Sequence, residues 1–333
     1  MGTDYVAGSG LPTRRPATSG TGLPARTPGG AAGGDDVSAL PTRTGGGASA
    51  NPDGAAPPLP TRTSRMRRGG RHSSAYRLSL PPTAPALVLA VPGTATPEAA
   101  QVAAEIAAAA SSACPGAEVR IGYLEGAEDS LAPMLDELPH DGDMPGGVVV
   151  PLLAGPNPAA AQLLQAAVGA TGTPLIVTDP LGPHPLLAEV MHHRLAEAGL
   201  ARAGRAGRIS VGNDADGVIV LAAGGQIAVQ SVGVVAVLLA SRLAVPVDAA
   251  SVTDVASIHA AAERLLAARV SKLALAPCLV GPEAGPGQLA AITAETGIAC
   301  APPLGAHSAL GHLVAIRYGA ALDDPALARM VSS

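Results

Sequence analysis

Short phrases in the second half of this 333-residue chain repeat phrases of the first half. Residues 148–156 read VVVPLLAGP, and residues 273–282 read LALAPCLVGP. Further along each half, residues 181–184 read LGPH and residues 304–307 read LGAH. A duplicated α/β unit places equivalent loops opposite each other, and clefts between such units are where small ligands bind. The repeat therefore predicts two similar domains with a binding cleft between them.

Short apolar runs alternate with helix-like stretches along both halves. We expect strands at residues 86–91, 119–124, 148–153, 175–177, 218–221, 245–247 and 272–279. We expect helices at residues 97–113, 130–138, 158–168, 184–198, 227–243, 257–269, 287–296 and 310–320. This alternation predicts an α/β fold in which each domain is a small parallel sheet with helices on both faces.

The N-terminal segment differs in composition from the rest of the chain. Residues 1–80 are rich in Gly, Pro, Thr, Ser and Arg and contain irregularly spaced variants of Leu-Pro-Thr-Arg. Ordering a backbone costs about 1–2 kcal/mol per residue, and this segment has too little apolar surface to offset that cost. We therefore expect a disordered tail over residues 1–80, an N-terminal domain over 81–205 and a C-terminal domain over 206–333, with an Arg- and Gly-rich linker at 202–213.

Charge is divided unequally between the tail and the folded part. The tail holds 10 Arg and 4 Asp, so residues 81–333 hold the remaining 11 of 21 basic and 22 of 26 acidic residues. An acidic folded part predicts no nucleic-acid partner. The uncharged stretch at 217–241 is long enough to raise the question of a membrane span. Gly224-Gly225 interrupts it, so we expect a strand, a turn and a buried helix, and no membrane partner.

The cysteine pattern and the N-terminus bear on localisation. The three cysteines lack the paired spacing of a zinc site or a disulfide framework and fit a reducing compartment. The first residues lack the charged start and apolar run of a signal peptide. We therefore expect a cytoplasmic protein, either a monomer or a homodimer.

In open parallel sheets, ligands bind outside the carboxyl ends of the strands, so the loops there hold the candidate residues. His184 and His307 occupy equivalent places and are either ligands or bases at the cleft, or helix-start histidines satisfied by local backbone. Glu125 faces the cleft or solvent, and turn roles compete with binding for Asn157 and Glu283. For His192 and His193, a solvated helix face is the favoured interpretation. The remaining strand-end candidates are Gly93, Thr94, Gly155, Gly224 and Gly225.

Several of these phrases together resemble the sirohydrochlorin chelatases, which have the class II chelatase fold. The resemblance covers residues 84–325 as two tandem copies. It rests on the Val-Pro-Gly-Thr turn at 91–94, the Gly-Tyr-Leu-Glu strand end at 122–125, the Pro-Leu-Leu-Ala-Gly loop at 151–155 and the Leu-Gly-Pro-His phrase at 181–184. It implies a protein that inserts Co²⁺ or Fe²⁺, as metal substrate and without an organic cofactor, into a tetrapyrrole in cobalamin or siroheme biosynthesis.

The chain departs from the family's pattern at its metal-binding histidines. Family members carry histidines in the first and third loops, where this chain has Pro92, Ala223, Asn157 and Glu283. Only Glu125 matches the family's metal-handling residues. Imidazole and carboxylate suit such divalent metals and can accept the pyrrole protons.

The resemblance and its departures define the expected site and three hypotheses. We expect the metal to be bound by Glu125, Glu283, His184 and His307, and catalysis to use Glu125, His184 and His307. The expected substrate-binding residues are Gly93, Thr94, Gly155, Asn157, Gly224 and Gly225. Backbone N–H groups at helix starts favour anions, so Gly93-Thr94 and Gly224-Gly225 either bind the tetrapyrrole carboxylates or only form tight turns. The hypotheses are an active chelatase, a non-catalytic tetrapyrrole- or metal-binding relative, and a binding protein for another anionic small molecule.

Overall fold

The computed structural model describes Leu80 and residues 84–127, 129–140, 142, 144–201, 214–281 and 283–323. All of them belong to one compact unit, Arg68–Ser333. The predicted linker and, apart from Leu80, the predicted tail lie outside the described residues.

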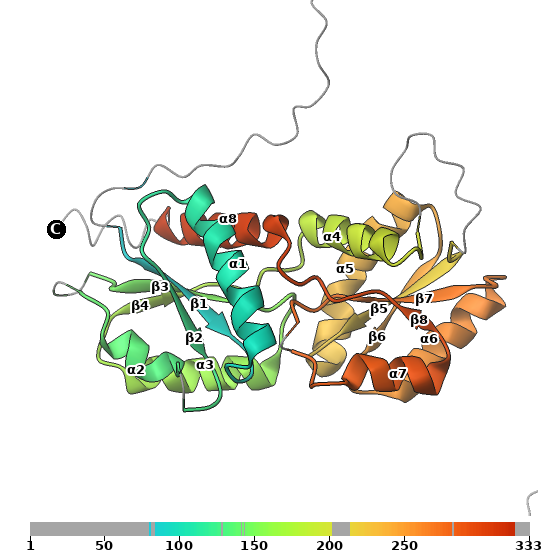
Figure 1. Ribbon diagram of the computed structural model, residues 1–333, viewed down its shortest axis with the longest axis horizontal. Helices are drawn as coiled ribbons and strands as arrows, with labels where there is room; N and C mark the ends of the chain where they lie inside the picture. Colours follow the sequence, from blue (N-terminus) through green and yellow to red (C-terminus); the bar gives the residue numbers. More distant parts are fainter. Residues whose placement is uncertain are drawn as a thin grey trace, which may run out of the picture. The chain divides into compact units, whose positions relative to one another are not determined.

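The first lobe is a four-stranded parallel sheet with the strand order β2-β1-β3-β4. Its elements are β1 (Ala86–Val91), α1 (Pro97–Ala113), β2 (Val119–Tyr123), α2 (Leu131–Asp136), β3 (Gly147–Pro151), α3 (Pro158–Ala170) and β4 (Leu175–Val177), followed by α4 (Pro185–Glu197). Figure 1 shows this lobe beside a second one of the same design.

The second lobe has the equivalent strand order β6-β5-β7-β8, again parallel throughout. Its elements are β5 (Gly217–Ala222), α5 (Gly225–Leu243), β6 (Val247–Ser251), α6 (Val255–Ala267), β7 (Leu273–Pro277), α7 (Gln288–Thr296) and β8 (Ala299–Cys300), followed by α8 (Ser308–Leu322). The predicted α/β fold with two similar parallel sheets is confirmed.

Two strands of the second lobe differ from the prediction. The strand expected at 245–247 lies at Val247–Ser251, because Ala244 adopts a left-handed φ of 56° that ends α5 and delays the strand. Its sequence is VDAAS, which lacks the continuous apolar run used to find strands. No strand was expected at Ala299–Cys300, which is only two residues long.

The central strands are apolar because helices cover both of their faces. Every residue of β1 is buried. Leu87 and Leu89 pack in a cluster with α1, whereas Val88 and Ala90 pack in a separate cluster with α2 and α3. The first of these clusters continues through both lobes, so the lobes share one aliphatic core.

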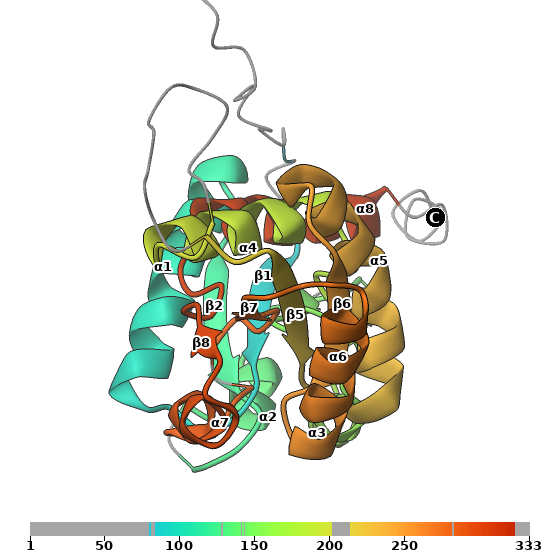
Figure 2. The ribbon, with the colours of Figure 1, turned by 90° about the vertical axis from the view of Figure 1, so that its right-hand side faces the viewer.

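The last helix of each half packs on the opposite lobe. Helix α4 contacts α5 and β7, and α8 contacts α1 and β3; Figures 1 and 2 show α4 over the second lobe. A Cβ at Gly311 of α8 would lie 2.4 Å from the Cβ of Ala109 in α1, so this contact requires glycine. The sequence did not predict this exchange, and the division at residues 205 and 206 stays a prediction.

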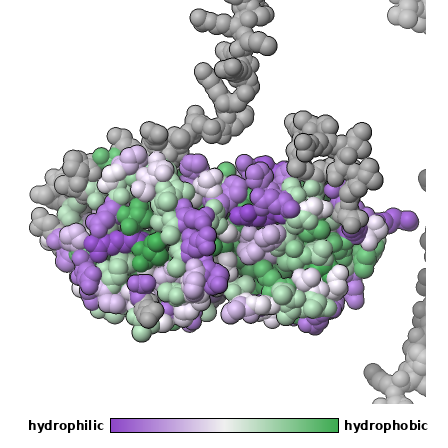
Figure 3. Space-filling view, viewed as in Figure 1, coloured by the Kyte–Doolittle hydropathy of each residue, from purple (hydrophilic) through white to green (hydrophobic). Residues whose placement is uncertain are grey.

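Helix α5 is the described helix that is long and apolar enough to cross a membrane by length and composition. In this structure it packs against α4 and β6. Its outward side exposes Ile227, Val234 and Val237. On the face drawn in Figure 3, hydrophilic and hydrophobic areas alternate over both lobes.

Candidate functional site

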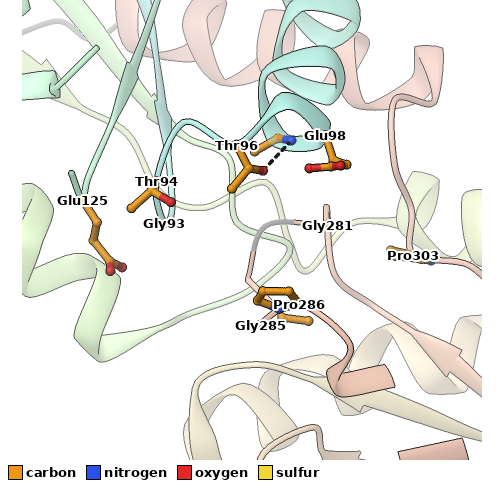
Figure 4. Close-up of a pocket in the computed structure, with 11 residues that line it drawn as sticks. Gly93, Thr94, Thr96, Glu98, Glu125, Gly281, Gly285, Pro286 and Pro303 are labelled. Carbon is orange, nitrogen blue, oxygen red and sulfur yellow. Dashed lines mark hydrogen bonds between the residues drawn. The ribbon is translucent and has the colours of Figure 1, made fainter. Parts of the chain in front are cut away.

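A pocket lies between the two lobes at the ends of their strands. Its volume is about 620 Å³, which is within the range of small-molecule sites. Figure 4 shows Thr94 and Glu125 from the first lobe opposite Pro286 and Pro303 from the second. Of the predicted residues, Gly93, Thr94 and Glu125 line this inter-lobe pocket.

The first-lobe wall is built by the turn that joins β1 to α1. Gly93 has a left-handed φ of 79°, which turns the chain out of the sheet. Thr96 caps α1, because its hydroxyl accepts a hydrogen bond from the Ala99 N–H at 3.2 Å. The Glu125 N–H donates to the Gly93 carbonyl at 3.0 Å and so ties the end of β2 to the same turn.

Two carboxylates give the inter-lobe pocket its charge. Glu125 follows β2, and Glu98 stands in the first turn of α1. Both residues are exposed. Sequence reasoning did not single out Glu98, although an acidic residue in the first turn after a strand-end loop was the available signal. None of the described residues that line the pocket is basic, so its charge favours a cation.

The equivalent loops on the other side of the lobe junction pack directly against each other. A Cβ on Gly224 would lie 2.4 Å from the Pro156 carbonyl oxygen and 3.0 Å from the Asn157 Cα. Asn157 caps α3 by accepting a hydrogen bond from the Ala160 N–H at 3.3 Å. Four predicted substrate-binding residues, Gly155, Asn157, Gly224 and Gly225, are therefore outside the pocket lining, and their binding role remains a prediction.

His184 and His307 both begin exchanged helices. The Nδ1 of His184 accepts a hydrogen bond from the Leu186 N–H, and the Nδ1 of His307 accepts one from the Ala309 N–H, each at 3.2 Å. A neutral imidazole that accepts at Nδ1 carries its proton at Nε2, and then neither nitrogen has a free lone pair for a metal. Each histidine therefore has a structural role that competes with metal binding.

The electrostatic surroundings favour the neutral, capping form of both rings. Burial lowers the pKa of His184, and the Arg317 charge lowers it further. Burial also lowers the pKa of His307, as do His193 and Arg194. The carboxylates of Glu189 and Glu197 oppose the shift at His307.

His307 also contacts His193, a residue expected on a solvated helix face. The His307 Nε2 lies 3.3 Å from the His193 Nδ1, and the two rings are nearly perpendicular at 81°. Because His307 Nδ1 is occupied by the helix cap, its Nε2–H is the donor to His193. No local sequence pattern predicts this contact, since 114 positions separate the partners.

Glu283 holds the loop behind the second-lobe wall. Its carboxylate accepts hydrogen bonds from the Val280 N–H at 2.9 Å and the Gly281 N–H at 2.7 Å. Burial raises the pKa of this carboxyl, and the backbone N–H groups of Gly281, Val280 and Ala154 oppose the rise. The contribution of Ala154, from the first lobe, places Glu283 at the junction of the lobes.

The four predicted metal ligands are not brought together. Glu125 lines the inter-lobe pocket, Glu283 binds its own loop, and the two histidines cap different helices. Throughout the described ranges, no group of three or more His, Cys, Asp or Glu side chains could hold a metal ion. The metal-binding role of these four residues remains a prediction, and their side chains do not form one site in this structure.

Comparisons with known proteins identify the fold. Residues 86–198 match the family model CbiX. The structure of the sirohydrochlorin chelatase SirB from Bacillus subtilis subspecies spizizenii with cobalt has a TM-score of 0.52 at 16% identity, covering 73% of this chain and 97% of SirB. CbiX, the terminal enzyme for siroheme biosynthesis in denitrifying bacteria, has a TM-score of 0.50 at 18% identity, covering 72% and 100%.

A larger protein shares the same fold. DR2241 from Deinococcus radiodurans, which has two further domains, has a TM-score of 0.50 at 18% identity, covering 74% of this chain and 59% of DR2241. No curated protein matches the chain. The first lobe, residues 86–198, therefore matches the CbiX family model, and the two lobes together have the fold of the sirohydrochlorin chelatases.

Proposed function

We propose that this protein brings a tetrapyrrole and Co²⁺ or Fe²⁺ together in the inter-lobe pocket, as a cytoplasmic sirohydrochlorin chelatase-like protein of cobalamin or siroheme biosynthesis. The observation that carries the proposal is the pocket of about 620 Å³ with Glu125 on its wall. Glu125 is the residue that matches the metal-handling pattern of the family. A pocket whose described lining holds two carboxylates and no basic side chain suits a divalent cation.

The proposed chemistry uses the carboxylates twice. They bind the hydrated metal weakly, which lets the ring nitrogens replace its water ligands. Insertion of a divalent metal releases two pyrrole protons, and a carboxylate on the pocket wall can accept one of them. Glu125 is the proposed acceptor, and Glu98 or solvent takes the second proton.

A second candidate is a non-catalytic relative that binds the tetrapyrrole or the metal without insertion. The occupied Nδ1 atoms of His184 and His307 favour it, because those rings supply no imidazole ligand while they cap their helices. The two candidates make the same binding prediction and differ in the rate of metal insertion.

One assay separates the two candidates. The full chain is incubated with sirohydrochlorin and Co²⁺ or Fe²⁺, and the absorbance change is compared with the spontaneous rate. Acceleration that Glu125→Gln abolishes supports insertion, whereas a shifted ring spectrum without acceleration supports the non-catalytic relative. If the protein neither accelerates metal insertion nor binds the ring or the metal, both candidate functions are refuted. Glu105→Gln is the matched control, because Glu105 is an exposed carboxylate on α1 that does not line the pocket.

A further inference from the structure

The two exchanged helices carry equivalent arginines. Arg194 follows His184 by ten positions, and Arg317 follows His307 by ten positions. Arg194 donates from Nε and Nη2 to the Leu304 carbonyl at 3.0 and 2.7 Å. Arg317 makes one longer contact, from Nη2 to the Leu181 carbonyl at 3.5 Å. Each arginine thus contacts the segment that precedes the other exchanged helix: Arg194 of α4 contacts the segment before α8, and Arg317 of α8 contacts the segment before α4.

The Arg194 contact leads directly to the pocket wall. Leu304 directly follows Pro303, which lines the inter-lobe pocket. The Leu304 N–H donates to the Leu279 carbonyl, and the Gly305 N–H donates to the Val280 carbonyl, each at 2.9 Å. The next residue after Val280, which is Gly281, also lines the pocket. Arg194 therefore contacts the segment 303–305, which includes the wall residue Pro303 and is hydrogen-bonded to Leu279 and Val280 beside the wall residue Gly281.

The open side of the junction needs this support more than the closed side. At the closed side, Gly224 packs on Pro156, and that direct contact fixes the separation of the loops. At the open side the pocket separates the facing loops, and a Cβ on Gly281, which lines it, would meet nothing within 4 Å. The stronger contact is at the open side, where His193 adds its contact to His307. The equivalent of His193 on α8 is Ile316, which has no such polar group.

We propose that Arg194 is a positioning residue, which sets the place of the second-lobe wall and so the shape of the inter-lobe pocket. Arg194 does not itself line the pocket, so it acts through the wall. The inference about the wall stands on the contacts alone, and the inference about ligand affinity rests on the proposed function.

The test compares Arg194→Met with the matched control Arg317→Met in the full chain. Amide hydrogen exchange is followed in residues 279–287, and Co²⁺ affinity is measured by titration. For Arg194→Met we expect exchange in this loop to rise about tenfold or more, the scale of one lost charge-assisted hydrogen bond. We expect Co²⁺ affinity to fall several-fold. Arg317→Met is expected to leave exchange in residues 279–287 unchanged.

The outcomes separate the two levels of the inference. Equal exchange of the loop in the wild type and Arg194→Met, or an equal rise in both variants, overturns the positioning role. If the wild type binds no Co²⁺, the proposed function is weakened while the exchange result still decides the role of Arg194. Arg194→Lys keeps the charge but loses the two-nitrogen contact, so it is expected to fall between wild type and Arg194→Met. It also replaces the methionine variant if that one does not fold.

Discussion

Replacing His184 by asparagine tests whether this residue is a helix cap or a metal ligand. Its backbone is extended, with φ −152° and ψ 145°, and its Nδ1 accepts from the Leu186 N–H. Asparagine is among the best N-cap residues and can accept the same hydrogen bond, whereas alanine cannot. We therefore expect His184→Asn to keep the cap and His184→Ala to lose it.

The expected loss of stability in His184→Ala is about 1 kcal/mol, the usual cost of removing an N-cap side chain. For a folded unit of this size, about 1 kcal/mol corresponds to a fall in Tm of roughly 2–4 °C. His184→Asn is expected to keep the wild-type Tm within about half of that difference. Thermal unfolding at pH 7.5 measures both variants, and a Co²⁺ titration is run on the same samples.

Two results would contradict the interpretation of His184 as a helix cap and not a metal ligand. If His184→Asn loses as much Tm as His184→Ala, the Nδ1 hydrogen bond does not support α4. If His184→Asn keeps its Tm but no longer binds Co²⁺ that the wild type binds, His184 is a metal ligand after all, and the sequence-based prediction is right.

Three further changes test other parts of the structure. Burial lowers the pKa of His184 and His307, so their neutral forms contribute stability that is present above about pH 6.5 and is lost as the pH falls through the lowered pKa. The double variant His184→Asn/His307→Asn should therefore lose less Tm than the wild type between pH 7.5 and 5.5. An identical loss of Tm in the two proteins contradicts this. Glu283→Gln loses one charged acceptor and should lower the free energy of unfolding, measured in urea, by roughly 1–3 kcal/mol. An unchanged free energy of unfolding would contradict the proposed role of Glu283 in holding its loop. Gly224→Ala is strained and overlaps a carbonyl oxygen, so its Tm should fall, while Gly233→Ala, with open space for a Cβ, should raise it slightly; the reverse order would contradict the tight loop contact.

Much of the fold could be predicted because buried parallel strands read as apolar runs. Residues 86–91 are one such run, and the strand occupies those positions. Polar strands such as Val247–Ser251 give a weaker signal, because Asp248 at the sheet edge bonds Arg264 instead of packing in the core. The helix exchange depends on contacts between residues far apart in the sequence, as with Tyr318, whose hydroxyl donates to the Pro85 carbonyl at 2.6 Å. No local pattern reports such contacts.

The candidate site was predictable only where its residues sit on the strand ends themselves. Gly93 and Glu125 follow β1 and β2, and the geometry of a parallel sheet brings such positions to one edge. The same rule placed His184 at that edge but did not show where its ring points. Its direction depends on the first N–H groups of α4, which compete with any ligand for the same nitrogen. Sequence alone leaves that competition undecided.

The asymmetry of the two sides can be traced to one pair of equivalent positions. Asn157 has a short side chain that caps α3 at once, so that helix begins at Pro158 and its loop stays short enough to pack on Gly224. At the equivalent position, Glu283 bonds back to its own loop, and α7 begins only at Gln288. The longer loop lines the inter-lobe pocket. Glu283, at a position where we expected a metal ligand, therefore shapes the wall of the pocket. The double exchange Asn157→Glu/Glu283→Asn should change the size of the pocket more than it changes the affinity for metal.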